Sequence, residues 1–305
     1  MDKLAYQALQ LAIRNRDGSY ATQYSRKKIL CMAMSQLKQL GYRNMTVRSL
    51  RTKHIQALFA RWREENLSVG TIKNRLSHLR WLARKIGKAN IVPTNSDLGL
   101  EKRRFSCLES KAMRVSISQL EAIKDVYVRT SLQLQAAFGL RREEAIKLVP
   151  VDADCGDHIT LTGSWAKGGR PRSITIRNEE QRIALNLAHK LAGQESLIPA
   201  HLNYCQQLGR FERCTAKAGI SKTHGLRHLY AQTRYEELTG WKSPAAGGPI
   251  NPKGYTKEER VKLLVHGGRT ALLPEQRELD KKARLTISAE LGHAREAITI
   301  QYLGR

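Results

Sequence analysis

The chain has 305 residues, which fits two domains, and its 53 basic against 27 acidic side chains give a net charge of +26, pointing to a phosphate polymer as partner. Five scattered cysteines without a Cys-x-x-Cys pair argue against a disulfide framework or a zinc site and favour a reducing compartment. The first residues do not resemble a signal peptide and no apolar run approaches a membrane span, so we expect a cytoplasmic, nucleoid-associated protein without a membrane contact.

Residues 1–90 show helical periodicity throughout, with apolar residues at helical spacing in 29–40, 55–62 and 72–86. Ser68 and Thr71 offer caps for the last of these helices. Few acids interrupt the bases on the polar faces, which favours a phosphate-facing surface over a solvated helix face or a generally basic protein such as one bound to the ribosome. These bases are Arg61, Arg63, Lys73, Arg75, Arg80, Arg84, Lys85 and Lys88.

The helical pattern lapses between Ile91 and Met113, where Pro93 and the basic run 102–104 indicate a linker. Helical signals resume at 118–121, Ser-Gln-Leu-Glu, which is a capping-box pattern. We therefore place a helical domain at 1–107, a linker at 108–115 and a second domain at 116–305.

In the second domain, a helix over roughly residues 129–148 is predicted to carry the sequence Gly-Leu-Arg that ends at Arg141. Two β-branched runs, 158–162 and 172–176, are typical of strands, so we expect a hairpin with Lys167 near its turn. Helices follow to about Leu238. The sequence thus indicates a mainly α-helical protein with a small β-sheet.

Five side chains suited to phosphate chemistry stand in three separate motifs: Arg141, His224 with Arg227, and His293 nine residues before Tyr302. Guanidinium groups offer paired donors that match non-bridging phosphate oxygens, so the two arginines are candidates for a clamp on the developing charge. A phenol with an unperturbed pKa of about 10 becomes a nucleophile in an electropositive pocket. Taken singly, each residue is more often structural, and only their order and spacing together favour attack on a phosphodiester without metal or cofactor.

In that order and spacing the motifs resemble those of the tyrosine recombinases, also called phage-type integrases. Residues 71–80 are similar to the SAM-like core-binding domain of this family, so the resemblance covers nearly the whole chain. It implies a helical core-binding domain, an α+β catalytic domain and a 3′-phosphotyrosyl intermediate with a free 5′-hydroxyl.

The remaining roles follow the same comparison. His224 is expected to be the acid–base partner of the tyrosine, and His293 to hydrogen-bond a phosphate oxygen. Lys167 is expected to protonate the departing 5′-oxygen, although two arginines share its hairpin. Glu144, three residues after Arg141, is expected to brace the site, and His228 to pack.

The chain departs from the family in two ways. Sixty-five residues separate Arg227 from His293, more than is usual, and the Gly/Pro-rich start of residues 240–285 indicates an insertion. It could contact another subunit, contact DNA or be a tolerated surface feature. Only three residues follow Tyr302, where many relatives continue into a helix that docks on the neighbouring subunit.

The resemblance implies double-stranded DNA as partner, a homo-tetramer on two DNA sites and room for an accessory DNA-bending protein. The function indicated is site-specific recombination or integration for a phage or other mobile element. Two alternatives stay open: a catalytically idle DNA-binding architectural or regulatory protein, and a type IB topoisomerase.

Overall fold

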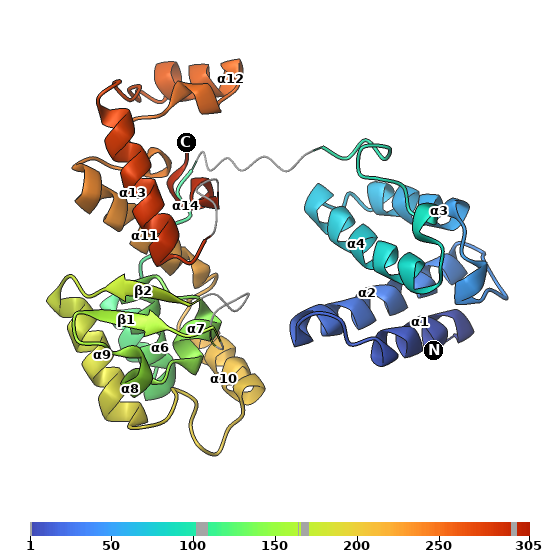
Figure 1. Cartoon of the computed structure of the whole chain (residues 1–305), viewed down its shortest axis with the longest axis horizontal. Helices are drawn as coiled ribbons and strands as arrows, with labels where there is room; N and C mark the ends of the chain where they lie inside the picture. Colours follow the sequence, from blue (N-terminus) through green and yellow to red (C-terminus); the bar gives the residue numbers. More distant parts are fainter. Residues whose placement is uncertain (1, 102–108, 164, 166–170, 294–297) are drawn as a thin grey trace. The chain divides into compact units, whose positions relative to one another are not determined.

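The computed structural model describes residues 2–101, 109–163, 165, 171–293 and 298–305 (Figure 1). Proximity of Cα atoms divides the chain into two compact units, Met1–Arg104 and Phe105–Arg305. Both consist mainly of helices, and the described residues contain a single sheet of two strands. The prediction of a mainly α protein with a small sheet is confirmed. No helix in these described ranges has the length and apolar character needed to cross a membrane.

The first unit packs four helices around Trp62 and neighbouring aliphatic residues. The helices are α1 (Lys3–Arg14), α2 (Tyr20–Gln39), α3 (Thr52–Glu64) and α4 (Val69–Lys85), with short 3-10 turns at Val47–Ser49 and Ala89–Ile91. Trp62 is fully buried and donates from Nε1 to Oε1 of Gln36 at 2.9 Å, so its polar edge is satisfied. Ser68 caps α4 by accepting from the backbone N–H of Thr71, as predicted.

Several of the bases expected to face phosphate are held within this unit. Arg61 pairs with Glu65, Lys85 pairs with Asp17, and Arg80 donates to the carbonyl of Pro93. Arg63 and Arg84 stand exposed on α3 and α4. The basic surface of these helices therefore combines structural and free-standing cations.

The second unit contains the sheet and the remaining helices (Figure 1). In chain order its elements are α5 (Ile117–Ala122), α6 (Val126–Phe138), α7 (Arg142–Lys147), α8 (Pro150–Ala153), β1 (His158–Leu161), β2 (Arg172–Thr175), α9 (Glu179–Ala192), α10 (Tyr204–Lys217), α11 (His224–Thr239), α12 (Lys257–Arg260), α13 (Gln276–Glu290) and α14 (Ile300–Leu303). Short 3-10 turns lie at Pro244–Ala246 and Pro252–Gly254, and a π-helix at Val261–His266. The main core lies where α6, α9, α11 and α13 meet the sheet.

The predicted hairpin is present. Strands β1 and β2 pair antiparallel, with His158 opposite Thr175 and Leu161 opposite Arg172. Alternation along β2 buries Arg172 and Ile174 and exposes the residues between and after them. Lys167 lies outside the described residues.

Two helix predictions were wrong in detail. The helix expected over 129–148 is interrupted: α6 ends at Phe138, the next residue Gly139 adopts the left-handed conformation with φ 61°, and α7 starts after Arg141. The capping box forms two residues earlier than predicted, because Ser116 rather than Ser118 accepts from the backbone N–H of Gln119. Ser116 with Gln119 and Ser118 with Glu121 have the same spacing, so the sequence alone did not distinguish the two capping boxes.

Parts of the expected linker and insertion belong to the second unit's framework. Met113 donates from its backbone N–H to the carbonyl of Gly225 at 3.0 Å, and Oγ of Ser110 donates to Gln232 at 2.8 Å, so residues 110–113 contact α11. Residues 276–285 form the first part of α13, where Ala283 is buried in the main core. The expected insertion, residues 240–285, thus overlaps the start of α13, and whether it is an insertion stays a prediction.

The break at Gly139 predicts a stability defect. A Cβ at this position would lie 2.5 Å from Cδ1 of Tyr230 in addition to requiring positive φ. We expect Gly139→Ala to lower the free energy of unfolding by about 2–4 kcal/mol, measured by denaturant titration. Gly240→Ala is the matched control, since Gly240 also has positive φ but open space around it, and about 1 kcal/mol is expected. Equal losses in the two variants would show that crowding against Tyr230 is unimportant.

Candidate active site

The first turn of α11 brings two of the predicted residues together. His224 is its first residue, and Arg227 follows three positions later on the same face. Arg227 is completely buried. Its Nη1 donates to the carbonyl of Gly139 at 2.6 Å and its Nη2 donates to the carbonyl of Leu291. The interrupted backbone after α6 thus supplies an acceptor that a continuous helix would have used internally.

Tyr302 meets both of these side chains. It lies on the short helix α14, and its ring is buried against the main core. The phenolic oxygen lies 3.3 Å from Nε2 of His224 and 3.3 Å from Nε of Arg227. The tyrosine of this chain therefore faces the arginine and histidine of the same chain.

Glu144 gathers the guanidinium groups. Its carboxylate is fully buried, 2.6 Å from Nη1 of Arg141, and it accepts two bonds from Arg172 at 2.7 and 3.0 Å. Arg227 approaches the same carboxylate at 4.0 Å. Glu144 also accepts from the backbone N–H of Arg141 at 2.7 Å, which makes Arg141 the cap of α7. The predicted bracing contact between Glu144 and Arg141 is therefore present.

The charge state of Glu144 follows from these neighbours. Burial alone would raise the pKa of its carboxyl, but hydrogen bonds from Arg172 and the charges of Arg172, Arg141 and Arg227 lower the pKa to about 2. The group is thus an anion at neutral pH. It neutralises one of the three guanidinium charges that surround it.

His293 completes the group around the tyrosine. Its ring centroid lies 5.6 Å from that of Tyr302, and its Nε2 is buried with no hydrogen-bond partner among the described residues. Burial, then the charges of Arg227 and Arg141, lower the pKa of His293 to about 3, so the imidazole is neutral at pH 7. Gly292 before it has φ 63° and leaves no room for a Cβ, which would lie 2.9 Å from Cδ of Arg172.

Five of the six predicted residues thus converge, and the structure adds others. Arg172 was noted only as a neighbour of Lys167, yet it joins Glu144 to the carbonyl of Glu290, where its Nε donates at 2.8 Å. The alternation of residues along β2 puts Arg172 on the same buried face as Ile174, and this pattern could have identified Arg172 from the sequence. His228, expected to pack, has its ring 4.6 Å from that of Tyr302. Burial, then the charge of His224, lower the pKa of His228 to about 4.

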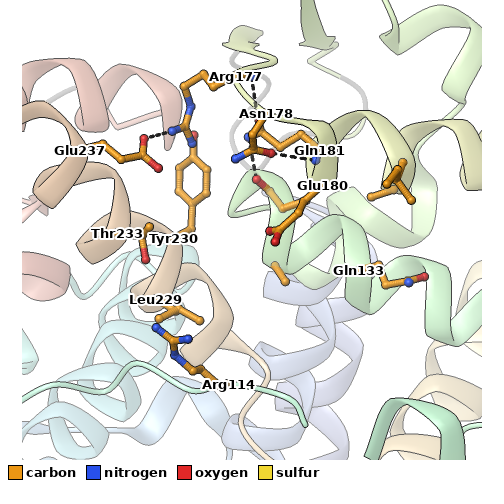
Figure 2. Close-up of a pocket in the computed structure, with 14 residues that line it drawn as sticks. Arg114, Gln133, Arg177, Asn178, Glu180, Gln181, Leu229, Tyr230, Thr233 and Glu237 are labelled. Carbon is orange, nitrogen blue, oxygen red and sulfur yellow. Dashed lines mark hydrogen bonds and ion pairs between the residues drawn. The ribbon is translucent and has the colours of Figure 1, made fainter. Parts of the chain in front are cut away.

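A separate pocket of about 490 Å³ lies between α6, α9 and α11 (Figure 2). The guanidinium carbon of Arg177 lies 5.5 Å from the ring centre of Tyr230 there, and the guanidinium pairs with Glu237. None of the converging residues lines this pocket. Within the described ranges, no three His, Cys, Asp or Glu side chains gather in a way that could hold a metal ion.

Two family models match the chain. The one described as phage integrase, N-terminal, matches residues 1–92, and the one described as integrase matches residues 106–233. A search among curated proteins finds no match.

Several solved structures share the fold. A lambda integrase dimer bound to a COC′ core site is 14% identical, with 98% of this chain and 75% of that chain covered and a TM-score of 0.58. XerH site-specific recombinase bound to palindromic difH substrate, a post-cleavage complex, is 15% identical, with coverage of 99% and 81% and a TM-score of 0.59. The Tn1549 transposon integrase with circular intermediate DNA is 16% identical, with coverage of 98% and 95% and a TM-score of 0.52.

Because the carboxylate of Glu144 is buried among arginines, replacing it with an amide should strongly destabilise the protein. Glu144→Gln keeps the side-chain shape but leaves Arg172 and Arg227 buried without a counter-charge, so we expect the free energy of unfolding at pH 7 to fall by about 3 kcal/mol. Since the pKa of Glu144 in the folded chain lies below its ordinary value of 4.5, this contribution is present above pH 4.5. It is lost as the pH falls towards 2.

The measurement is denaturant unfolding of both proteins between pH 7 and pH 3. Glu143→Gln serves as control, because the side chain of Glu143 is half exposed and pairs with Lys147 at 2.6 Å, and a change within about 0.5 kcal/mol is expected. If the difference in the free energy of unfolding between wild type and Glu144→Gln stayed constant across this pH range, the assignment of the anion to Glu144 would be contradicted.

Proposed function

Since the chain belongs to the tyrosine recombinase family of phage-type integrases, we propose that it cleaves and rejoins DNA at specific sites, for a phage or other mobile element. The observation that carries the proposal is the position of the Tyr302 hydroxyl, 3.3 Å from both Arg227 and His224. A phenol buried among cations is the expected setting for a tyrosine nucleophile.

In the proposed reaction, the phenolic oxygen of Tyr302 attacks the phosphorus of a DNA phosphodiester and its proton passes to His224. The bond from phosphorus to the 5′-oxygen breaks, leaving a 3′-phosphotyrosyl bond and a 5′-hydroxyl, with Lys167 as the proposed proton donor to the leaving oxygen. Attack by the 5′-hydroxyl of another strand reverses these steps. Because the covalent intermediate replaces one phosphodiester by another, the exchange requires no ATP.

Two arginines are proposed to stabilise the charge that develops on phosphorus. Nη2 of Arg141 and Nη2 of Arg227 both point at the carbonyl of Leu291, at 3.4 Å in the first case. Their donors therefore converge on one oxygen. We propose that non-bridging phosphate oxygens engage the same convergent donors when DNA is bound.

Double-stranded DNA is the proposed partner of both units. The charge of +26 supports this, as do the COC′ core site bound by lambda integrase, the palindromic difH substrate bound by XerH and the circular intermediate DNA bound by the Tn1549 integrase. The homo-tetramer on two DNA sites is proposed from the family resemblance, as is a role for an accessory DNA-bending protein.

The alternatives differ in what they require of the site. A DNA-binding protein without catalysis has no use for a phenol held between Arg227 and His224, so the geometry favours the enzyme. A type IB topoisomerase would share the chemistry but would relax supercoils without exchanging two sites. Exchange between two sites, as opposed to relaxation alone, distinguishes the recombinase.

Removing one oxygen atom tests the function. We expect Tyr302→Phe to bind DNA with the affinity of the wild type but to form no covalent adduct, because only the nucleophilic oxygen is lost. The measurement is capture of protein-linked DNA from cells that express either protein, followed by sequencing of the DNA ends. Discrete 3′-linked sites are expected from the wild type alone.

Tyr204→Phe, on α10 and outside the cluster, is the control and should form adducts at the wild-type sites. Adducts from Tyr302→Phe would show that another residue is the nucleophile. Occupancy without adducts from the wild type would favour the idle DNA-binding protein.

Salt dependence tests the contact with phosphates. We expect the logarithm of the DNA association constant to fall against the logarithm of salt concentration with a slope of about −5 or steeper, measured by fluorescence anisotropy. Replacing the exposed Arg63 and Arg84 by glutamine should flatten the slope by about 2 if each meets a phosphate. An unchanged slope would remove these faces of α3 and α4 from the interface.

A further inference from the structure

The residues that directly follow Tyr302 are bound by the segment that the sequence indicated as an insertion. The hydroxyl of Tyr255 accepts from the backbone N–H of Arg305 at 2.8 Å and donates to the backbone oxygen of Arg305 at 2.7 Å. The backbone N–H of Asn251 lies 3.4 Å from the same oxygen. Tyr255 is itself buried. One side chain thus satisfies both backbone groups of a residue three positions after the tyrosine.

The segment Ile250–Leu272, which we call the clasp, has a structure of its own. Ile250 and Ala271 form a parallel bridge, in which Ile250 donates to the carbonyl of Thr270 and Leu272 donates to the carbonyl of Ile250, both at 2.9 Å. Tyr255 packs with Ile250 and Leu263 in a small separate core. The hydroxyl of Tyr255 is therefore presented from a folded element.

A second anchor comes from α13. Nη1 of Arg284 donates to the carbonyl of Gly304 at 2.8 Å, and Nε of Arg284 donates to Asp280 at 2.8 Å. The same Asp280 oxygen accepts from the hydroxyl of Tyr235 on α11 at 2.6 Å. A buried chain of hydrogen bonds thus ties the backbone after Tyr302 to the two helices that flank the site, α11 and α13 (Figure 1).

The helix that carries Tyr302 depends on such anchors. α14 has only four residues, too few to be stable by its own hydrogen bonds. Leu303 is completely buried, and the carbonyl of Tyr302 accepts from Gln232 at 3.0 Å. Beyond Leu303, the backbone N–H of Gly304 donates to the carbonyl of Ile300 at 3.0 Å, and Gly304 and Arg305 also contact Arg284 and the clasp.

We propose that the clasp holds the nucleophile in the active site of its own chain, with Tyr255 as the positioning residue. The proposal rests on the function proposed above, and it gives residues 250–272 a role other than contact with DNA, contact with another subunit or a neutral surface feature. Attack on phosphorus requires the phenolic oxygen to be placed within about 1 Å, and a misplacement of that size can cost about 100-fold in rate. Release of Arg305 would free the end of α14 and displace the hydroxyl of Tyr302. Arg141, Arg172 and Arg227 would stay in place, because none of the contacts that they make with described residues involves the clasp.

The test is Tyr255→Phe in the full chain, which removes the hydroxyl and keeps the ring that packs in the clasp. Without DNA, hydrogen–deuterium exchange should show faster exchange of the amides of residues 303–305, by about tenfold, because two hydrogen bonds to Arg305 are lost. Tyr204→Phe, as control, should leave this exchange unchanged.

Two reactions on the DNA site recovered by covalent capture distinguish a displaced Tyr302 from damage to the whole active site. In the first, the protein cleaves a nicked duplex, which depends on Tyr302, and Tyr255→Phe should be slower by about tenfold. In the second, the strand end carries a 3′-(4-nitrophenyl) phosphodiester. A 5′-hydroxyl attacks its phosphorus, the bond to the nitrophenyl oxygen breaks and 4-nitrophenol is released, so joining requires the arginines but not Tyr302. Tyr255→Phe and wild type should join at equal rates.

Unchanged exchange at residues 303–305 would overturn the proposal, as would unchanged cleavage. An equal loss in cleavage and joining would also overturn it, since that result indicates damage to the whole site. If the wild type itself neither cleaves nor joins, the proposed function fails, and the exchange result still decides whether Tyr255 holds Arg305 in place.

Discussion

The buried carboxylate of Glu144 makes the interaction on which the candidate site of the second unit depends. It contacts Arg141 and Arg172 directly and lies 4.0 Å from Arg227, and these side chains come from three separate parts of the chain. A guanidinium without an acceptor is costly to bury, and Arg227 has no exposed surface at all. The negative charge of Glu144 allows several arginines to be buried together, and the helices therefore enclose a positively charged site.

Helix ends supply the other acceptors. Gly139 follows the last residue of α6, and Glu290 and Leu291 stand at the end of α13, so their carbonyls have no partner within the helix. All three accept from buried arginines: Gly139 and Leu291 from Arg227, and Glu290 from Arg172. Carbonyls at helix C-termini carry partial negative charge, which suits cations. The break after α6 is therefore part of how Arg227 is accommodated.

Features that depend on residues close together in the chain could be predicted from the sequence, whereas contacts between residues far apart in the chain could not. The spacing of three between His224 and Arg227 puts both on one face of a helix whatever the fold, and alternation in 158–162 and 172–176 indicated the hairpin. The break at Gly139 was missed because apolar periodicity continues across it. The contacts of Arg172 with Glu290 and of Tyr255 with Arg305 were missed because these partners lie 118 and 50 residues away in the chain. The roles of the converging residues stay predictions until the variants are measured.

The charge balance of the cluster suits the proposed reaction. Three guanidinium groups, Arg141, Arg172 and Arg227, surround one carboxylate, and His293 is neutral at pH 7, so these groups carry a net charge of +2. A phosphodiester brings one negative charge, and the pentacoordinate phosphorus formed by attack of a phenolate carries two. In the proposed reaction the phenol's proton passes to His224, so the second negative charge on phosphorus forms together with an imidazolium that the bound substrate does not face. The added attraction therefore arises only as the transition state forms, and such a difference is what accelerates a reaction. His293 itself stays neutral at pH 7, because burial and the charges of Arg227 and Arg141 lower its pKa to about 3.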